Sequence, residues 1–265
     1  MKEVISKDGT NIAYDKVGNG PALILVDGAL CYRDSGPNRP LAALLAQHFT
    51  VITYDRRGRG DSGDKKPYSI EREVEDIEAL IVEDGGAVFV YGISSGAALA
   101  LEAAKRIPAI RRVALYEAPF VVDNSRPPVP DGYLLEMNEL LSSGRRGAAV
   151  KYFMSKGVGV PAIFVAMMQF MPAWSKLKAV AHTLPYDTLL TVEQQKGKPL
   201  PASQWSSVTV PVLVVEGSKS PVWMRNAMRA LANVLSHAKY RTLEGQTHIV
   251  KPAALAPVLT AFFNE

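Results

Sequence analysis

The sequence lacks the features of several protein classes. Cys31 is the single cysteine among 265 residues, so no disulfide can form within the chain and an oxidising compartment is not required. No uninterrupted apolar run reaches the roughly 20 residues that span a bilayer. The first nine residues contain no apolar core of a signal peptide. We therefore expect a soluble protein of the cytoplasm that has no membrane partner.

Charge is not concentrated anywhere along the chain either. The formal net charge is +4, and basic residues are scattered in pairs such as Arg56-Arg57, Arg111-Arg112 and Arg145-Arg146. A nucleic-acid-binding surface usually needs a basic patch or stripe. We expect these pairs to be solvated surface residues and no nucleic acid to be a partner.

Short apolar runs alternate with helical stretches over most of the chain. A weakly alternating stretch, 11–17, precedes a strong turn at 18–21, so a hairpin of edge strands is expected there. The remaining pattern predicts a parallel sheet with helices on both faces, an α/β protein. Strands are predicted at 22–26, 49–54, 87–91, 113–116, 212–217 and 239–243, and helices at about 40–47, 69–83, 97–106, 222–235 and 253–263.

This alternation stops between residues 125 and 201, where no clear strand is visible. We predict a core domain formed by 1–124 and 202–265, with a helical insertion at 125–201. Met154, Met167, Met168 and Met171, four of the eight methionines, lie in the insertion with aromatic residues between them. Ordinary helix packing accounts for part of such a set, but we favour an apolar pocket under a cap because the sheet pattern resumes afterwards. Its helices are predicted at 134–141, 148–155, 161–171 and 173–182.

One pentapeptide, Gly-Ile-Ser-Ser-Gly at residues 92–96, lies between a predicted strand and an alanine-rich helix. A Gly-x-Ser-x-Gly pattern in this context is typical of a tight turn in which Gly92 and Gly96 provide steric clearance. The turn would hold Ser94 in a strained conformation at a helix N-terminus, which stabilises nearby negative charge. A glycine-rich turn with an incidental serine is the alternative.

Three segments together resemble the α/β-hydrolase family: residues 92–96, Asp-Arg-Arg-Gly-Arg-Gly-Asp-Ser at 55–62, and Gly-Gln-Thr-His at 245–248. The resemblance covers nearly the whole chain. It implies a doubly wound, mostly parallel eight-stranded sheet with a helical cap inserted after the sixth strand. It also implies an activated nucleophile, Ser94, and a catalytic base, His248, with no metal or organic cofactor. The other histidines are expected at surface or structural positions: His48, His182 and His237.

The carboxylate of the implied triad departs from the common family pattern. Many members carry it after the strand that is 212–217 here, but residues 218–221 contain no carboxylate and Glu216 is a poor fit. The alternative family position follows the strand 113–116, where Glu117 lies 23 residues after Ser94 (117 − 94). Glu117 resembles the acid of zearalenone lactonases and of haloalkane dehalogenases with a glutamate acid. We therefore expect Glu117 to orient His248, with Asp123 as the alternative.

The family also implies an oxyanion hole of two backbone N–H groups. Ser95 supplies one, and the loop after 22–26 supplies the other through Ala29, with Gly28 making room. Asp27 stands where the family often has histidine, which leaves the backbone donor in place. The Asp-Gly loop, the Gly-x-Ser-Ser-Gly turn and the Glu-x-Pro segment at 117–119 all resemble zearalenone lactonases.

The predicted function is hydrolysis of a carboxylic ester or lactone through an acyl-enzyme. An apolar, methionine-rich cap suggests a hydrophobic and fairly bulky small-molecule substrate. Cleavage of a C–C bond, perhydrolysis and non-catalytic binding of a small ligand remain open, and so does the choice between monomer and homodimer. Dehalogenases and epoxide hydrolases use aspartate as the nucleophile, so these activities are disfavoured. The predicted pocket residues are Leu30, Cys31, Tyr32, Met154, Phe164, Met168, Trp174 and Trp223.

Overall fold

The computed structural model describes residues 1–265 and contains one eight-stranded sheet in the order β1-β2-β4-β3-β5-β6-β7-β8. Strands β1 and β2 are antiparallel to their neighbours, and β3 to β8 run parallel to one another. The doubly wound, mostly parallel sheet predicted from the sequence is confirmed. The strands are β1 Lys2–Ile5, β2 Asn11–Val17, β3 Ala22–Val26, β4 Thr50–Tyr54, β5 Val88–Ile93, β6 Ile110–Tyr116, β7 Val212–Gly217 and β8 Ala238–Leu243.

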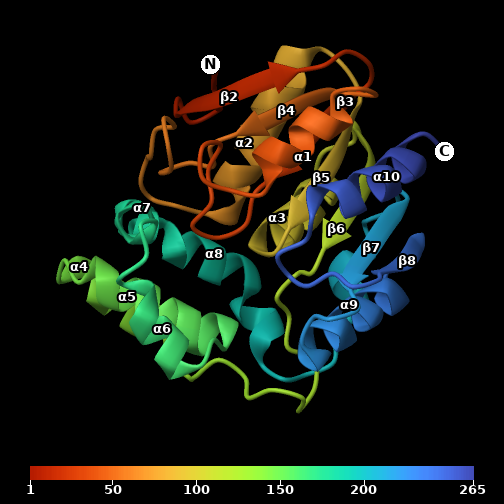
Figure 1. Ribbon diagram of the computed structural model, residues 1–265. Helices are drawn as coiled ribbons and strands as arrows, with labels where there is room; N and C mark the ends of the chain where they lie inside the picture. The colour runs from red at the N-terminus through yellow and green to blue at the C-terminus, as the bar shows by residue number, and fades with distance from the viewer.

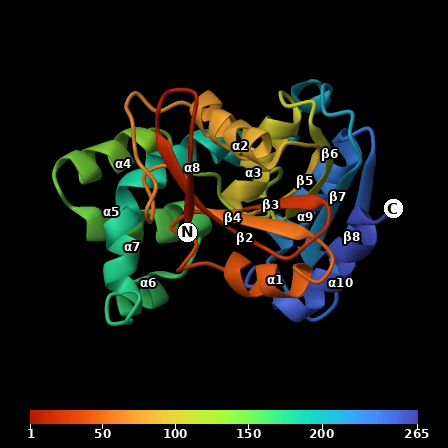
Figure 2. The same cartoon turned by 90° about the horizontal axis from the view of Figure 1, so that it is seen from above.

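Helices cover both faces of this sheet, as Figure 2 shows. On one face lie α1 (Asn38–Leu45) and α10 (Pro252–Phe263), and on the other lie α2 (Ile70–Asp84), α3 (Ser95–Ala104) and α9 (Val222–Val234). Successive side chains of a strand point to opposite faces. The continuous apolar runs of the central strands therefore supply both hydrophobic layers.

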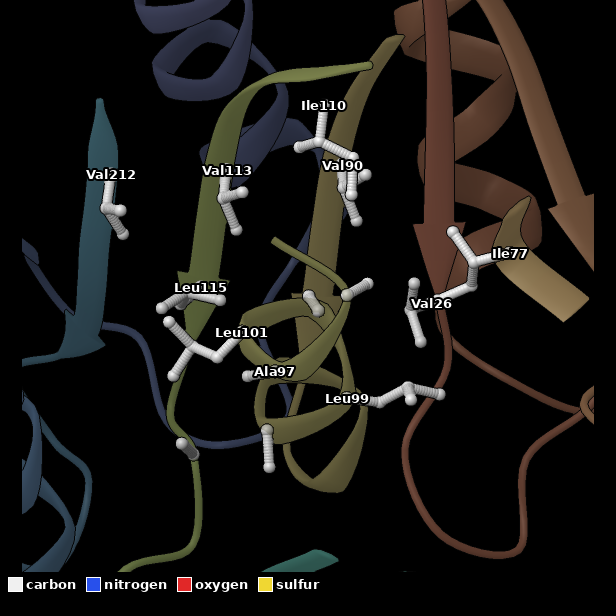
Figure 3. Close-up of a cluster of buried hydrophobic side chains, with 14 of the residues drawn as sticks. Val26, Ile77, Val90, Ala97, Leu99, Leu101, Ile110, Val113, Leu115 and Val212 are labelled. Atoms are coloured by element: carbon white, nitrogen blue, oxygen red, sulfur yellow. The ribbon is translucent and has the colours of Figure 1, made fainter. Parts of the chain in front are cut away.

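The strand periodicity is visible in the packing of α3. Val90, Val113 and Val212 project from three parallel strands toward the face that this helix covers (Figure 3). On the helix, Leu101 lies against that layer, and the alanines around it add little bulk. Small side chains let α3 approach the sheet closely, which fixes the position of its N-terminal end.

The hairpin at the start of the chain differs from the prediction. Strand β2 pairs with β1 and with β4, while β3 lies on the far side of β4. The connection through Gly18 and Gly20 therefore crosses over β4, and the hairpin turn lies at residues 6–10 instead. The composition of residues 18–21 predicts that the chain reverses there, but it does not show which strand pairs with β2.

All helices of the predicted insertion lie between β6 and β7, and Figure 1 shows them grouped at one side of the sheet. We call residues 125–201 the cap. Helix α8 runs between α4 and the core helix α3. None of the helices in the molecule combines the length and the apolar character needed to cross a membrane. The cap elements are α4 Tyr133–Ser142, α5 Arg146–Tyr152, the π-helix η1 Phe153–Val158, α6 Ala162–Met168, α7 Trp174–Val180, the 3-10 helix η2 Ala181–Thr183, α8 Leu184–Thr191 and the 3-10 helix η3 Val192–Gln195.

The prediction that the arginine pairs are solvated is wrong for one pair. Arg56 and Arg57 are 1% and 0% exposed, whereas Arg145 and Arg146 are exposed as expected. Each buried guanidinium is paired with a buried carboxylate, Arg56 with Glu73 and Arg57 with Asp76. A buried arginine needs such partners, and they come from α2, which the sequence alone could not place beside the loop after β4.

Candidate active site

Ser94 occupies a sharp turn between β5 and α3. Its backbone has φ 57° and ψ −129°, a conformation that side-chain-bearing residues rarely adopt. The two glycines that flank it permit the turn, because a Cβ on Gly92 would lie 2.3 Å from the carbonyl oxygen of Gly96 and a Cβ on Gly96 would lie 2.4 Å from that of Val26. The N–H of Ser94 donates to the carbonyl of Tyr116 at 2.9 Å, which holds the turn against β6.

Glu117 and His248 come together from segments 131 residues apart. The Nδ1 atom of His248 lies 2.8 Å from Oε2 of Glu117. The other carboxylate oxygen, Oε1, accepts the backbone N–H of Gly217 at 2.7 Å. Glu117 is fully buried, so both of its oxygens have partners and the carboxylate has one fixed orientation. The structure thus joins the predicted acid to the predicted base.

The loop that carries His248 is held by the strands beneath it. The hydroxyl of Tyr116 donates to the carbonyl of Thr247 at 2.6 Å, and the N–H of Lys219 donates to that of Gln246 at 2.8 Å. His248 itself is half-buried and faces the same cavity as Ser94. No hydrogen bond joins the two side chains directly. Catalytic hydrogen bonds are often long in ligand-free enzymes and shorten when substrate binds.

Backbone strain is confined to this region. Only three residues other than glycine have a positive φ, and they are Leu30, Ser94 and Glu117. Each follows the carboxyl end of a parallel strand, β3, β5 or β6, at the edge of the sheet where such folds place their ligand sites. A left-handed backbone costs about 1–3 kcal/mol per residue and persists where the surrounding structure enforces it. The strain therefore marks one edge of the sheet as functional.

The predicted oxyanion donors flank the serine. Ala29 and Ser95 both line the cavity at Ser94. The N–H of Ala29 donates to no acceptor in the protein, and the N–H of Ser95, at the first position of α3, has no partner within its helix. Gly28 lies so close that a Cβ there would be 2.9 Å from Cβ of Ser94. Two free N–H groups beside a nucleophile suit an oxyanion in the adjacent space.

The cavity between these residues and the cap has a volume of about 40 Å³, which accommodates a few water molecules. Ligand pockets usually enclose roughly 300–1,000 Å³. A bulky substrate therefore requires the cap to move away from the core. The lining consists of Ala29, Ser94, Ser95, Pro119 and His248 from the core, Phe153, Gly157, Val158, Asp187, Thr191 and Gln195 from the cap, and Trp223 and Met224 from α9.

Of the eight side chains predicted to line the pocket, the structure places only Trp223 on this cavity. Phe164 is 58% exposed and does not line the cavity. A short apolar helix has the same sequence pattern whether its apolar face points inward or outward, so the prediction failed there. The other six do not line the cavity either. Leu30, Tyr32, Met154 and Trp174 belong to the apolar cluster of the cap or pack against it, while Cys31 and Met168 are half-buried.

The cavity-lining residues that the prediction missed include two from α8, which was not among the predicted helices. Asp187 and Thr191 of this helix line the cavity. The available signal was Pro185, because proline is favoured in the first turn of a helix. Because α7, η2 and α8 follow one another without a gap, no loop in the sequence marks where α8 begins.

Two other groups considered from the sequence, Asp123 and Cys31, are not linked to His248. Asp123 accepts hydrogen bonds from Ser125 and Asn226, and it makes none with His248. Burial raises the pKa of Cys31 to about 12, so its thiol stays protonated and unreactive near neutral pH. Burial also raises the pKa of Asp27, to about 7, although Arg59 and Arg56 oppose the shift.

A strained serine between β5 and α3 of such a sheet places the chain among the hydrolytic α/β enzymes. A model of the alpha/beta hydrolase family matches residues 20–258, and the chain belongs to that family. The crystal structure of an alpha/beta hydrolase from Sphaerobacter thermophilus is similar, with 51% sequence identity and a TM-score of 0.91 over 99% of this chain and 100% of that one.

More distant comparisons agree on the fold. An enol-lactonase from Burkholderia xenovorans has 21% identity and a TM-score of 0.70 over the full length of both chains, a likeness that concerns the fold alone. The uncharacterized hydrolase YraK of Bacillus subtilis is 35% identical over 104 residues, which span 38% of each chain. The similarity to zearalenone lactonases stays a prediction.

Proposed function

We propose that this enzyme hydrolyses a carboxylic ester or lactone through Ser94, His248 and Glu117. The observation that carries the proposal is the fixed hydrogen bond between His248 Nδ1 and the buried carboxylate of Glu117, at the cavity that also holds the strained Ser94. A neutral histidine that donates from Nδ1 has Nε2 free as an acceptor. That nitrogen is the one available to take the proton of Ser94.

The reaction follows from these positions. Oγ of Ser94 attacks the substrate carbonyl carbon while His248 Nε2 removes the hydroxyl proton. Glu117 stabilises the resulting imidazolium without taking its proton. The N–H groups of Ala29 and Ser95 stabilise the negative oxygen of the tetrahedral intermediate. His248 then protonates the leaving alcohol, and water, activated by the same histidine, cleaves the acyl-enzyme.

The cavity bears on which substrates react. Phe153, Val158 and Trp223 contribute apolar side chains to the cavity lining, and Thr191 and Gln195 contribute polar ones. With only about 40 Å³ available, a small acyl group fits next to Ser94 in the closed state, whereas the bulky substrate suggested by the cap composition needs an opened cap. We propose an ester or lactone with a compact acyl part. The dependence of activity on acyl-chain length would distinguish such a substrate from a bulky one that needs an opened cap.

One observation favours a second candidate, a non-catalytic binder of a small ligand. Ser94 and His248 share a cavity without a hydrogen bond between them, as expected of a triad that does not turn over. The two candidates differ in whether Ser94 is activated, because an unactivated serine does not react with electrophilic phosphorus reagents.

The test is labelling of the folded protein with a fluorophosphonate, located by peptide mass spectrometry, in the wild type and in Ser94→Ala. We expect one adduct, on Ser94, that is absent from the variant. Ser206→Ala is the matched control, because Ser206 is an exposed serine whose hydroxyl donates to the carbonyl of Ser203 and should not affect labelling. Labelling is followed by turnover of p-nitrophenyl esters and of lactones of graded size. A folded wild type that takes no label and hydrolyses no ester would favour the binder.

A further inference from the structure

A buried carboxylate of the cap lies beneath the proposed oxyanion hole. Asp187, on α8, is 1% exposed, and both of its oxygens accept short hydrogen bonds. Oδ1 accepts the hydroxyl of Ser95 at 2.7 Å and Nη1 of Arg56 at 2.7 Å. Oδ2 accepts Nη2 of Arg59 at 2.6 Å. One carboxylate of the cap is therefore bonded to the core at three points.

Arg59, which donates to Oδ2 of Asp187, links this carboxylate to the loop that carries Ala29. Nη1 of Arg59 donates to the carbonyl of Gly28 at 2.7 Å and to that of Cys31 at 3.2 Å, on either side of Ala29. Its Nε donates to the hydroxyl of Thr183, also in the cap, at 3.1 Å. Arg59 is 1% exposed, so its hydrogen bonds are shielded from water.

A second arginine anchors Asp187 to the core. Arg56 makes a bidentate pair with Glu73 through Nε and Nη2, at 2.6 and 2.7 Å, which leaves Nη1 directed at Asp187. A planar guanidinium held in this way has one orientation. The position of Asp187 relative to α3 is therefore set by α2 as well as by its own helix.

We propose that Asp187 is a positioning residue that sets the two N–H donors of the oxyanion hole, Ser95 through its hydroxyl and Ala29 through Arg59. This proposal rests on the proposed function. It also makes the oxyanion hole depend on the closed cap, because α8 carries the carboxylate that fixes both donor segments. An opened cap would admit substrate, and closure would restore the geometry needed for reaction.

The charge of Asp187 is consistent with this role. Burial alone would raise the pKa of its carboxyl, but Arg59 and Arg56 lower it below its usual range. The ionised group accepts hydrogen bonds only, so it cannot exchange a proton with Ser95 or with substrate. Asp187 makes no hydrogen bond to His248, and the proton steps of the reaction remain with the triad.

The discriminating variant is Ser95→Ala, which keeps every charge and the backbone N–H but removes the hydroxyl that Asp187 holds. We expect kcat for p-nitrophenyl acetate to fall by roughly tenfold to hundredfold, less than the ~10²–10³ lost when a donor is removed outright. KM and the pH dependence of kcat/KM should stay unchanged, because neither substrate binding in the ground state nor His248 is altered. A purely structural role would instead lower thermal stability and leave kcat per folded molecule unaffected.

Thr188→Val is the matched control. Thr188 is also buried on α8, and its hydroxyl donates to the carbonyl of Leu184 at 2.9 Å in its own helix, with no link to the oxyanion loops. It should retain wild-type kcat. Asp187→Asn should lose at least as much kcat as Ser95→Ala, and if it does not fold, Ser95→Ala decides alone.

The inference is overturned if Ser95→Ala keeps wild-type kcat or if Thr188→Val loses as much. Either result with a wild type that labels at Ser94 and turns over ester leaves the proposed function intact. A wild type that neither labels nor turns over ester would refute the proposed function, and this inference with it.

Discussion

The carboxylate of Glu117 joins two strand ends, because Oε2 lies 2.8 Å from Nδ1 of His248 while Oε1 accepts the N–H of Gly217 at 2.7 Å. The glutamate follows β6, and Gly217 is the last residue of its neighbour β7. The side chain of Glu117, which follows β6, thus reaches the place beside His248 that a residue following β7 would otherwise occupy. The histidine is oriented by a group with no freedom to turn.

Glu117→Gln should lower kcat for an aryl ester by about 10⁴-fold, the loss seen when the acid of a comparable triad becomes an amide. The amide no longer stabilises the imidazolium and favours the wrong histidine tautomer. Asp123→Asn is the control, since Asp123 bonds Ser125 and Asn226 away from the histidine, and it should keep wild-type kcat. The reverse ranking of the two variants would refute the assignment of the acid.

Asp76→Asn should destabilise the fold by about 3–5 kcal/mol, because it leaves a guanidinium buried without its main counter-charge. Asp76 accepts Nε and Nη2 of Arg57 at 2.8 and 2.7 Å, and both side chains are almost completely buried. Urea unfolding followed by circular dichroism measures the change. Asp34→Asn breaks an ion pair with Arg39 that is exposed on both sides and should change stability by less than about 1 kcal/mol. Equal effects would show that burial does not govern these pairs.

Asp27→Asn should change how stability depends on pH. Burial raises the pKa of Asp27 from 3.8 to about 7 in the folded protein. The folded state therefore holds the proton more tightly than the unfolded state. This contribution to stability is complete below pH 3.8 and is lost as pH rises through about 7.

Asparagine is neutral at every pH, so the gain in Tm of the variant over the wild type should be larger at about pH 8.5 than at about pH 5. Thermal melts at the two pH values give this difference directly. A gain that is the same at both would show that the Asp27 carboxyl does not titrate within this range.

Trp223→Ala should shift activity toward longer acyl chains. Trp223 lines the 40 Å³ cavity and is fixed by the guanidinium of Arg126, 4.5 Å from the centre of its ring. Removing the indole enlarges the closed site, and we expect the ratio of kcat/KM for p-nitrophenyl hexanoate to that for acetate to rise by roughly tenfold. Trp205→Phe is the control, because Trp205 packs on Phe120 in the core and should not change the ratio. An unchanged ratio in Trp223→Ala would place the acyl group elsewhere.

The core of the fold was predictable because its signals are local. Continuous apolar runs require burial on both faces, and the glycines around Ser94 are required by the turn itself. Glu117 could be singled out because the stretch 218–221 has no carboxylate. The cap was harder, since a phenylalanine in a short helix carries no local signal of whether it lines the cavity, as Phe153 does, or is exposed, as Phe164 is.

The sequence by itself determined the strands from β2 to β8, the helices around the sheet and the turn that strains Ser94, because each depends on residues close together in the chain. Only the tertiary structure decided that Arg56 and Arg59 are buried, that Gly217 fixes the carboxylate of Glu117 and that Asp187 reaches under the proposed oxyanion loop. Each of these contacts joins segments more than 100 residues apart or depends on partners from another element. The desolvation of a charge is set by what the fold brings around it, and no local pattern records those neighbours.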